Sequence, residues 1–212
     1  RWLEDYALYM ACKRHFGMKS WTDWPDQTLR LRKTPEVLEK YRTELREDVE
    51  LFIYIQFLFF RQWTALRAYL HSLDIQIIGD LPIYVPLDSA DVWAEPQFFQ
   101  MDDQCIPTAV SGVPPDYFSE DGQLWGTPLY RWDVMQADGF GWWIRRIDGA
   151  GKLYDVIRID HFRGLDTYWA VPYGETTARN GEWRQGPGMA LVSALTGWFP
   201  GLQFIAEDLG YP

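Results

Sequence analysis

Three short apolar segments of the chain each end in a carboxylic acid. The segments read IIGD, IRID and FIAE, and the acids are Asp80, Asp160 and Glu207. A single acid at the end of a strand is commonly a helix N-cap or a solvated loop residue. Three in succession are better explained by one shared site, because neighbouring carboxyl groups can act as nucleophile, general acid and general base.

The residues around Asp160 and Glu207 predict different protonation states for the two acids. Side chains alternate along a strand, so Arg158 should share a face with Asp160 and favour the ionised carboxylate that a nucleophile needs. Glu207 ends the apolar segment FIAE and precedes Asp208. Apolar surroundings and a neighbouring negative charge raise a carboxyl pKa, which favours a proton donor. Such a pair is typical of glycosidic-bond cleavage, with retention of configuration at a separation of about 5–5.5 Å.

Other chemistries have little support in the sequence. There is no G-x-S-x-G nucleophile elbow, the three histidines and two cysteines lack metal-ligand spacing, and FSEDGQ matches only part of a calcium loop. We therefore predict no metal site and no cofactor. His161 is either a packing residue at a strand end or a hydrogen-bond donor to a sugar hydroxyl, and its place beside Asp160 favours the second.

Strands and helices alternate in the part of the chain that carries these acids. Strands are expected at residues 75–85, 156–160 and 203–208, with helices at 131–147 and 189–199 between them. This order predicts an α/β fold with a parallel sheet. DGFGWW lacks the third glycine of a dinucleotide-binding turn and follows no strand. A partial (β/α)8 TIM barrel with long inserted loops and helices fits better, since its strand ends meet at one face.

The whole chain, residues 1–212, is expected to form one incomplete catalytic barrel domain. Residues 1–72 are predicted to be a mostly helical insertion, with a helix that starts at the Thr34 N-cap and Pro35. The run LFIYIQFLFF at 51–60 is too short to span a bilayer and is predicted to be a buried helical segment. Residues 73–212 would supply barrel strands, helices and active-site loops, the longest of them at 86–130.

Composition excludes several classes of function. The net charge of −10 offers no cationic face for nucleic acid, no run is apolar and long enough to predict a membrane span, and the first residues RWLEDYALYM hold no signal-peptide pattern. Cys12 and Cys105 are too few for a disulfide framework, which favours a cytoplasmic location. Aromatic residues make up 17% of the chain, which fits both a packed core and a sugar-binding groove. The sequence carries no indication of oligomeric state.

Several longer motifs identify a family resemblance. QWTALRAYL, IIGDLPIYVPLDSADVWA, VSGVPPDYFSEDGQLWGTPLYRW, VIRIDHFRGLDTYWAVPYGETTARNGEWRQGPG and IAEDLG occur in that order between residues 62 and 210. The chain resembles the 4-alpha-glucanotransferases, the amylomaltase or disproportionating-enzyme family of the α-amylase superfamily. The resemblance implies transfer of a segment of an α-1,4-glucan, such as a maltooligosaccharide, starch or glycogen, to the 4-hydroxyl of another glucan or of glucose.

The resemblance also implies roles for individual residues. Asp160 would be the nucleophile and Glu207 the acid/base. The residues expected to contact or orient the sugar are Asp80, Tyr84, Asp116, Tyr117, Phe118, Trp125, Arg158, His161 and Asp208. The segment PPDYFSEDGQLWG resembles the family's mobile loop over the acceptor subsites, which would hold a sugar and exclude water.

Two departures from the family pattern stand out. Thr127 occupies a position where the family usually has Asn, which removes an amide from WGTP. The chain also lacks an initiating Met and stops before the family's third catalytic Asp, so we read it as an internal piece that is inactive alone. Two rivals remain at this stage: an α-glucan hydrolase that uses water as acceptor, and a non-catalytic glucan-binding fragment.

Overall fold

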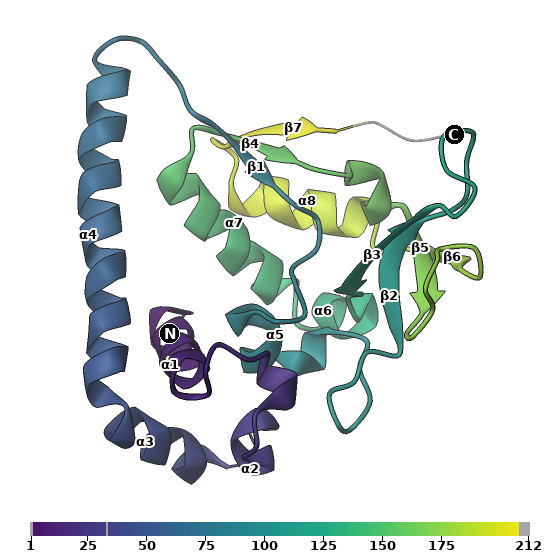
Figure 1. Cartoon of the computed structure of the whole chain (residues 1–212). Helices are drawn as coiled ribbons and strands as arrows, with labels where there is room; N and C mark the ends of the chain where they lie inside the picture. The colour runs from purple at the N-terminus through teal and green to yellow at the C-terminus, as the bar shows by residue number, and fades with distance from the viewer. Residues whose placement is uncertain (1, 33, 208–212) are drawn as a thin grey trace.

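The computed structural model describes residues 2–32 and 34–207, which form two sheets flanked by helices (Figure 1). The α-helices are α1 (Trp2–His15), α2 (Gln27–Arg30), α3 (Pro35–Glu44), α4 (Arg46–His71), α5 (Ala90–Ala94), α6 (Trp132–Ala137), α7 (Gly141–Leu153) and α8 (Met189–Trp198). The strands are β1 (Ile78–Leu81), β2 (Ala109–Val113), β3 (Gln123–Pro128), β4 (Val156–Ile159), β5 (Thr167–Pro172), β6 (Glu182–Gln185) and β7 (Gln203–Ala206). Short 3-10 helices are η1 (Trp21–Asp23), η2 (Pro96–Phe98) and η3 (Phe162–Leu165).

The first sheet is parallel, with the strand order β1-β4-β7 that the alternation of strands and helices predicts (Figure 1). Its central strand β4 buries the β-branched residues Val156, Ile157 and Ile159, as strands covered on both faces do. The strand predicted at residues 75–85 is longer than β1, because only residues 78–81 pair with β4. β1 is also less buried than predicted, since Ile78 is 59% exposed.

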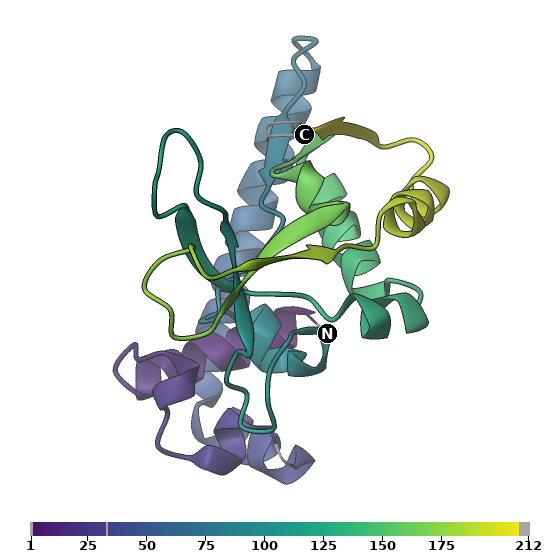
Figure 2. The same cartoon turned by 90° about the vertical axis from the view of Figure 1, so that its right-hand side faces the viewer.

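The second sheet is antiparallel, with the order β3-β2-β5-β6, and it lies to one side of the parallel sheet (Figures 1 and 2). Its strands come from the regions at 86–130 and after 160 that the sequence predicts to be loops. That prediction was wrong because these strands contain Gly, Pro and Thr and lack a clean apolar alternation. The two hairpins β2–β3 and β5–β6 are joined by the pairing of β2 with β5, between residues about 60 positions apart in sequence.

The helices flanking the parallel sheet differ in one respect from the prediction. The single helix expected at 131–147 is two helices, α6 and α7, separated by a turn. Gly139 and Phe140 both take left-handed backbone conformations there, with φ of 66° and 60°. Glycine adopts this conformation without steric cost, which explains why the helix stops. The helix expected at 189–199 is confirmed as α8.

The amino-terminal third is helical, as predicted. The Thr34 hydroxyl accepts a hydrogen bond from the backbone N–H of Val37, and Pro35 takes the first helical position. The helix that begins at Pro35 is interrupted at Leu45, whose backbone leaves the helical region, and α4 follows it. Helix α1 packs against α4 and α5.

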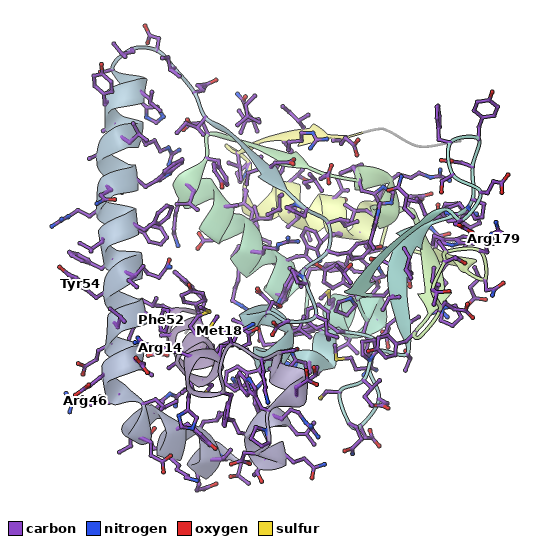
Figure 3. All side chains as sticks on the ribbon, in the orientation of Figure 1. Arg14, Met18, Arg46, Phe52, Tyr54 and Arg179 are labelled. Atoms are coloured by element: carbon purple, nitrogen blue, oxygen red, sulfur yellow. The ribbon has the colours of Figure 1, made fainter. Side chains whose placement is uncertain are left out.

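The run at 51–60 was predicted to be buried, and this prediction was wrong. It lies in α4, which buries none of its residues, and Tyr54 and Phe57 are each 56% exposed. In Figure 3, Tyr54 projects from the side of α4 away from α1, whereas Phe52 lies toward α1. The helix is apolar on more than one side, but the described residues cover only part of it. Among those residues, no helix is both long and apolar enough to cross a bilayer.

Aromatic side chains form much of the core. The high aromatic content of the sequence is thus explained in part by a packed interior, one of the two explanations considered above. Trp21, Trp24, Trp93 and Trp143 are each 1% exposed or less. They belong to one cluster that continues through the aliphatic residues of β4 and α8. Large rings of this kind bury much apolar area for little loss of side-chain entropy, so they stabilise the interior that supports the parallel sheet.

Asp155 connects α4 to the start of the parallel sheet. Its carboxylate accepts hydrogen bonds from Arg67, His71 and the backbone N–H of Ile77. The backbone N–H of Asp155 donates in return to the carbonyl of Ile77 at 2.9 Å. The reciprocal pair joins the chain just before β1 to the chain just before β4, and so fixes how the two strands align.

Candidate active site

Four charged side chains share one face of the parallel sheet. Asp80 lies directly opposite Arg158, and Ile159 lies opposite Ala206. Asp160 and Glu207 therefore follow in the next row, where the Glu207 N–H donates to the carbonyl of Ile159 at 3.1 Å. Because side chains alternate between faces, these two rows put all three acids beside Arg158.

The guanidinium of Arg158 contacts each of the three carboxylates. Its Nη1 donates to Asp80 Oδ1 at 2.5 Å, and its Nη2 lies 3.1 Å from Asp160 Oδ1 and 3.6 Å from Glu207 Oε1. The hydrogen bond with Asp80, assisted by the charges of all three acids, raises the pKa of Arg158. The site therefore contains a permanent cation among three carboxyl groups.

Asp160 and Glu207 lie close together but in different environments. Since both approach the same Nη2 atom, the two oxygens concerned lie within about 7 Å of each other, which includes the separation expected for retaining chemistry. The Asp160 side chain is 45% exposed, whereas that of Glu207 is 13% exposed. One carboxyl group thus faces solvent and the other is largely enclosed.

His161 orients Glu207 through its backbone. It takes a left-handed conformation with φ of 52°, and its N–H donates to Glu207 Oε2 at 2.8 Å. Its ring meets the Trp125 ring edge-on, with centroids 4.8 Å apart. Burial lowers the pKa of His161 despite the nearby charges of Glu207 and Asp160. A neutral ring offers one donor and one acceptor at neutral pH.

The loop between β2 and β3 carries the most exposed aromatic pair among the residues that the structure describes. Tyr117 is 97% exposed and Phe118 is 93% exposed, with the rings edge-on to each other. Asp116 Oδ1 accepts hydrogen bonds from the N–H groups of Phe118 and Ser119 at 2.9 and 2.8 Å, which shapes the turn. The same hairpin places Trp125, 38% exposed, against His161. The loop therefore leads directly to the carboxylate cluster.

Tyr84 lies behind Trp125 rather than on the open surface. It is 8% exposed, and its ring packs against the rings of Trp125 and Tyr130 at 6.5 and 5.7 Å. Burial raises the pKa of its hydroxyl. Tyr84 thus supports the aromatic wall of the site from within. Asp208, the remaining predicted contact, lies outside the described residues.

Comparison with known proteins identifies the family. The sequence model described as 4-alpha-glucanotransferase, glycoside hydrolase family 77, matches residues 1–212. The chain belongs to this family. A 4-alpha-glucanotransferase from Clostridium butyricum is 48% identical over all 212 residues, and one from Thermus thermophilus is 50% identical over 210 residues, 99% of the chain. These alignments cover 43% and 41% of the two relatives, so the chain spans less than half of their length.

Solved structures agree with the family assignment. An amylomaltase from Streptococcus agalactiae in complex with acarbose matches 100% of this chain and 42% of its own, with a TM-score of 0.95 and 43% identity. An amylomaltase from Corynebacterium glutamicum, 22% identical, matches with a TM-score of 0.77 over 100% of this chain and 27% of its own, which supports the fold alone. The α/β fold is therefore that of amylomaltases over the matched segment.

Thr127, where the family resemblance leads us to expect Asn, has a local partner. The Thr127 hydroxyl lies 2.5 Å from the hydroxyl of Ser111 on β2. Ser111 is fully buried, so this hydrogen bond satisfies a polar group that would otherwise be unpaired. A threonine at this position thus ties β3 to β2 at the base of the loop.

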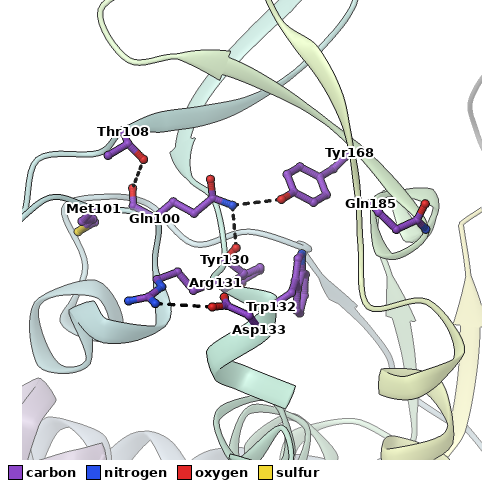
Figure 4. A pocket seen from close by; sticks show the side chains of 9 residues that line it. All are labelled: Gln100, Met101, Thr108, Tyr130, Arg131, Trp132, Asp133, Tyr168 and Gln185. Atoms are coloured by element: carbon purple, nitrogen blue, oxygen red, sulfur yellow. Dashed lines mark hydrogen bonds and ion pairs between the residues drawn. The ribbon is translucent and has the colours of Figure 1, made fainter. Parts of the chain in front are cut away.

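The described part of this family member shows two further features. No group of three or more His, Cys, Asp or Glu side chains in it is placed to hold a metal ion. A hollow of about 420 Å³ shares no residue with the carboxylate cluster (Figure 4). Sequence reasoning missed it, because its walls come from five separate segments and contain no motif.

Proposed function

We propose that the protein containing this chain is a retaining 4-alpha-glucanotransferase. It would cleave an α-1,4-glucan and transfer the released segment to the 4-hydroxyl of glucose or of another glucan. The observation that carries this proposal is the guanidinium of Arg158 in contact with the carboxylates of Asp80, Asp160 and Glu207. The names of the relatives and the acarbose complex of the Streptococcus agalactiae amylomaltase support the same class of substrate.

The reaction proceeds in two displacements. In the first, the Asp160 carboxylate attacks the anomeric carbon while the bond to the leaving oxygen breaks, and Glu207 gives that oxygen its proton. In the second, Glu207 takes the proton of the acceptor 4-hydroxyl, whose oxygen attacks the same carbon and releases Asp160. The two inversions restore the original configuration, and each residue ends in its starting protonation state.

The neighbouring groups assist both carboxyl groups. The positive charge of Arg158 stabilises the ionised form of Asp160 before attack and after release. The backbone N–H of His161 holds Oε2 of Glu207, which leaves Oε1, 3.6 Å from Arg158 Nη2, as the oxygen that carries the proton to and from the substrate. Asp80 fixes Arg158 in place by its hydrogen bond. The His161 ring binds a sugar hydroxyl.

The loop between β2 and β3 favours transfer over hydrolysis. The exposed rings of Tyr117 and Phe118 cover the acceptor sugar, and Trp125 stacks against it. A bound sugar that excludes water gives its 4-hydroxyl the advantage of proximity over a water molecule. Asp116 shapes the loop, and Asp208 contributes a hydrogen-bond acceptor for substrate.

The parallel sheet belongs to a (β/α)8 barrel in the whole protein. Three parallel strands with helices α7 and α8 leading into β4 and β7 are what such a barrel contains. Residues 1–72 form its helical insertion. A cytoplasmic location agrees with two free cysteines, Cys12 and Cys105. Relatives from rice and potato are named as chloroplastic or amyloplastic, so location varies within the family.

Incubating the full-length protein with maltotriose tests the proposal. Transfer produces glucose together with a ladder of longer maltosaccharides, and Asp160→Asn should lower the rate by at least 10³-fold, because only positioning and charge stabilisation remain. Glucose and maltose without longer products would identify a hydrolase instead. Activity unchanged by Asp160→Asn would refute the assignment of the nucleophile.

A further inference from the structure

The hollow of about 420 Å³ is bordered by the segment that precedes β2, by strands β5 and β6, and by the start of α6 (Figure 4). Its size falls within the range of small-molecule binding sites, roughly 300–1,000 Å³. The residues that line it are Gln100, Met101, Thr108, Tyr130, Arg131, Trp132, Asp133, Tyr168 and Gln185. None of them belongs to the carboxylate cluster or to the loop at its side.

The inner wall of the hollow is rigid. Gln100 donates from Nε2 to the carbonyl of Tyr130 at 2.9 Å and to the hydroxyl of Tyr168 at 3.1 Å, and its Oε1 accepts from Arg184 at 2.8 Å. Tyr130 is 1% exposed and Tyr168 is 5% exposed, so both rings are held by packing. A wall fixed in this way loses little entropy when a ligand binds.

The polar groups at the rim are of mixed kind and nearly neutral in sum. Arg131 and Asp133 form an ion pair with 3.6 Å between nitrogen and oxygen, and both are well exposed. The amide nitrogen of Gln185 donates to the carbonyl of Asp166, which holds the side chain in place. Thr108 brings a hydroxyl group from the opposite side. A balanced set of donors and acceptors favours a neutral polyhydroxylated ligand over a phosphate or a metal ion.

The hollow is connected to the candidate active site through aromatic rings. Tyr130, at the inner wall, packs against Tyr84 with centroids 5.7 Å apart, and Tyr84 packs against Trp125 at 6.5 Å. The rings of Tyr130 and Trp125 are therefore within about 12 Å of each other. A glucan chain held at both places would have its reacting end at a raised effective concentration.

We propose that this hollow is a second glucan-binding site, which takes one or two neutral sugar units of a longer chain. The identity of the sugar rests on the proposed function, whereas the presence of a site for a neutral polyol does not. Arg131, Asp133 and Gln185 bind the hydroxyl groups, and the rigid wall around Gln100 fixes their positions. The site anchors long substrates and leaves the chemistry at Asp160 unchanged.

Binding of maltoheptaose to full-length protein carrying Asp160→Asn tests the proposal by isothermal titration. Adding Asp133→Ala and Gln185→Ala should remove one of two classes of binding site, or weaken it at least tenfold. The matched control adds Asp103→Ala and Gln136→Ala, exposed residues of the same types that do not line the hollow, and should leave both classes unchanged. A single class of site with the same affinity in all three proteins would overturn the inference.

A second variant fills the hollow instead of removing groups. Thr108→Trp, in a protein with otherwise wild-type sequence and an unchanged melting temperature, should raise KM for amylose at least fivefold and leave kcat/KM for maltotriose within twofold. An unchanged KM for amylose would overturn the inference. If wild-type protein shows no transfer but the hollow variants still weaken maltoheptaose binding, the proposed function fails and this inference holds. If wild-type protein shows normal transfer but the hollow variants bind maltoheptaose as tightly as their parent, the proposed function holds and this inference fails.

Discussion

Replacing Asp155 by asparagine tests how the fold holds the strands of the site in place. The carboxylate of Asp155 is 10% exposed and accepts hydrogen bonds from Arg67, His71 and the backbone of Ile77. Burial alone would raise its pKa, but the hydrogen bonds from His71, Ile77 and Arg67 outweigh burial and lower the pKa to about 2. The ionised form is therefore strongly favoured in the folded protein.

The size of the effect follows from this shift. One pKa unit corresponds to about 1.4 kcal/mol, and a fall of nearly two units from the ordinary value, discounted for the partial exposure of His71 and Arg67, gives about 2 kcal/mol of folding free energy. A depressed folded-state pKa stabilises the protein above the unfolded-state value near 4. This stabilisation is lost as the pH falls from about 5 through 2, because both states then become protonated.

Urea unfolding followed by tryptophan fluorescence at several pH values measures the prediction. We expect Asp155→Asn to lower the free energy of unfolding by about 2 kcal/mol at pH 7, and the difference from wild type to shrink toward zero near pH 2. Asp148→Asn is the matched control, since its ion pair with Lys152 is more than half exposed and should contribute at most about 0.5 kcal/mol. Equal effects of the two substitutions, or a difference that persists at pH 2, would refute the reasoning.

Two further predictions concern the site itself. Arg158→Lys keeps the positive charge but cannot reach three carboxylates at once, so kcat/KM for maltotriose should fall at least tenfold. The control is Arg145→Lys, whose ion pair with Glu95 lies away from the site, and it should leave kcat/KM within twofold. Similar values of kcat/KM for the two variants would contradict the electrostatic role of Arg158. Trp125→Ala should raise KM for glucose as acceptor about tenfold and increase the share of hydrolysis, measured by product chromatography. An unchanged ratio of transfer to hydrolysis would remove Trp125 from the acceptor site.

The positions of the three acids could be predicted because the signal is local. An apolar, β-branched segment that ends in an acid predicts both a strand and the residue at which the strand ends. The parallel arrangement of the strands follows from the helices between the segments. Alternation along β4 also sufficed to pair Arg158 with Asp160. The contact between Arg158 and Asp80 required more, since it depends on which residues of β1 and β4 lie opposite each other.

The antiparallel sheet and the hollow could not be predicted for a related reason. Strands β2 and β3 read AVSGV and QLWGTP, which contain turn residues and no sustained alternation. Strand β3 pairs with β2, and β2 in turn pairs with β5, which lies about 60 positions farther along the chain. The burial of Tyr84 likewise depends on Tyr130, 46 positions later in sequence. Local patterns carry no information about such contacts.

The alignment of β1 with β4 shows how a residue outside the site determines its chemistry. A slip of one residue would bring Ile157 or Ile159 level with Asp80 and turn the Arg158 side chain away from it. Two bonds oppose this slip: the N–H of Ile77 donates to the Asp155 carboxylate at 2.8 Å, and the N–H of Asp155 donates to the carbonyl of Ile77 at 2.9 Å. Asp155 thus places the cation among the carboxylates although it contacts none of them.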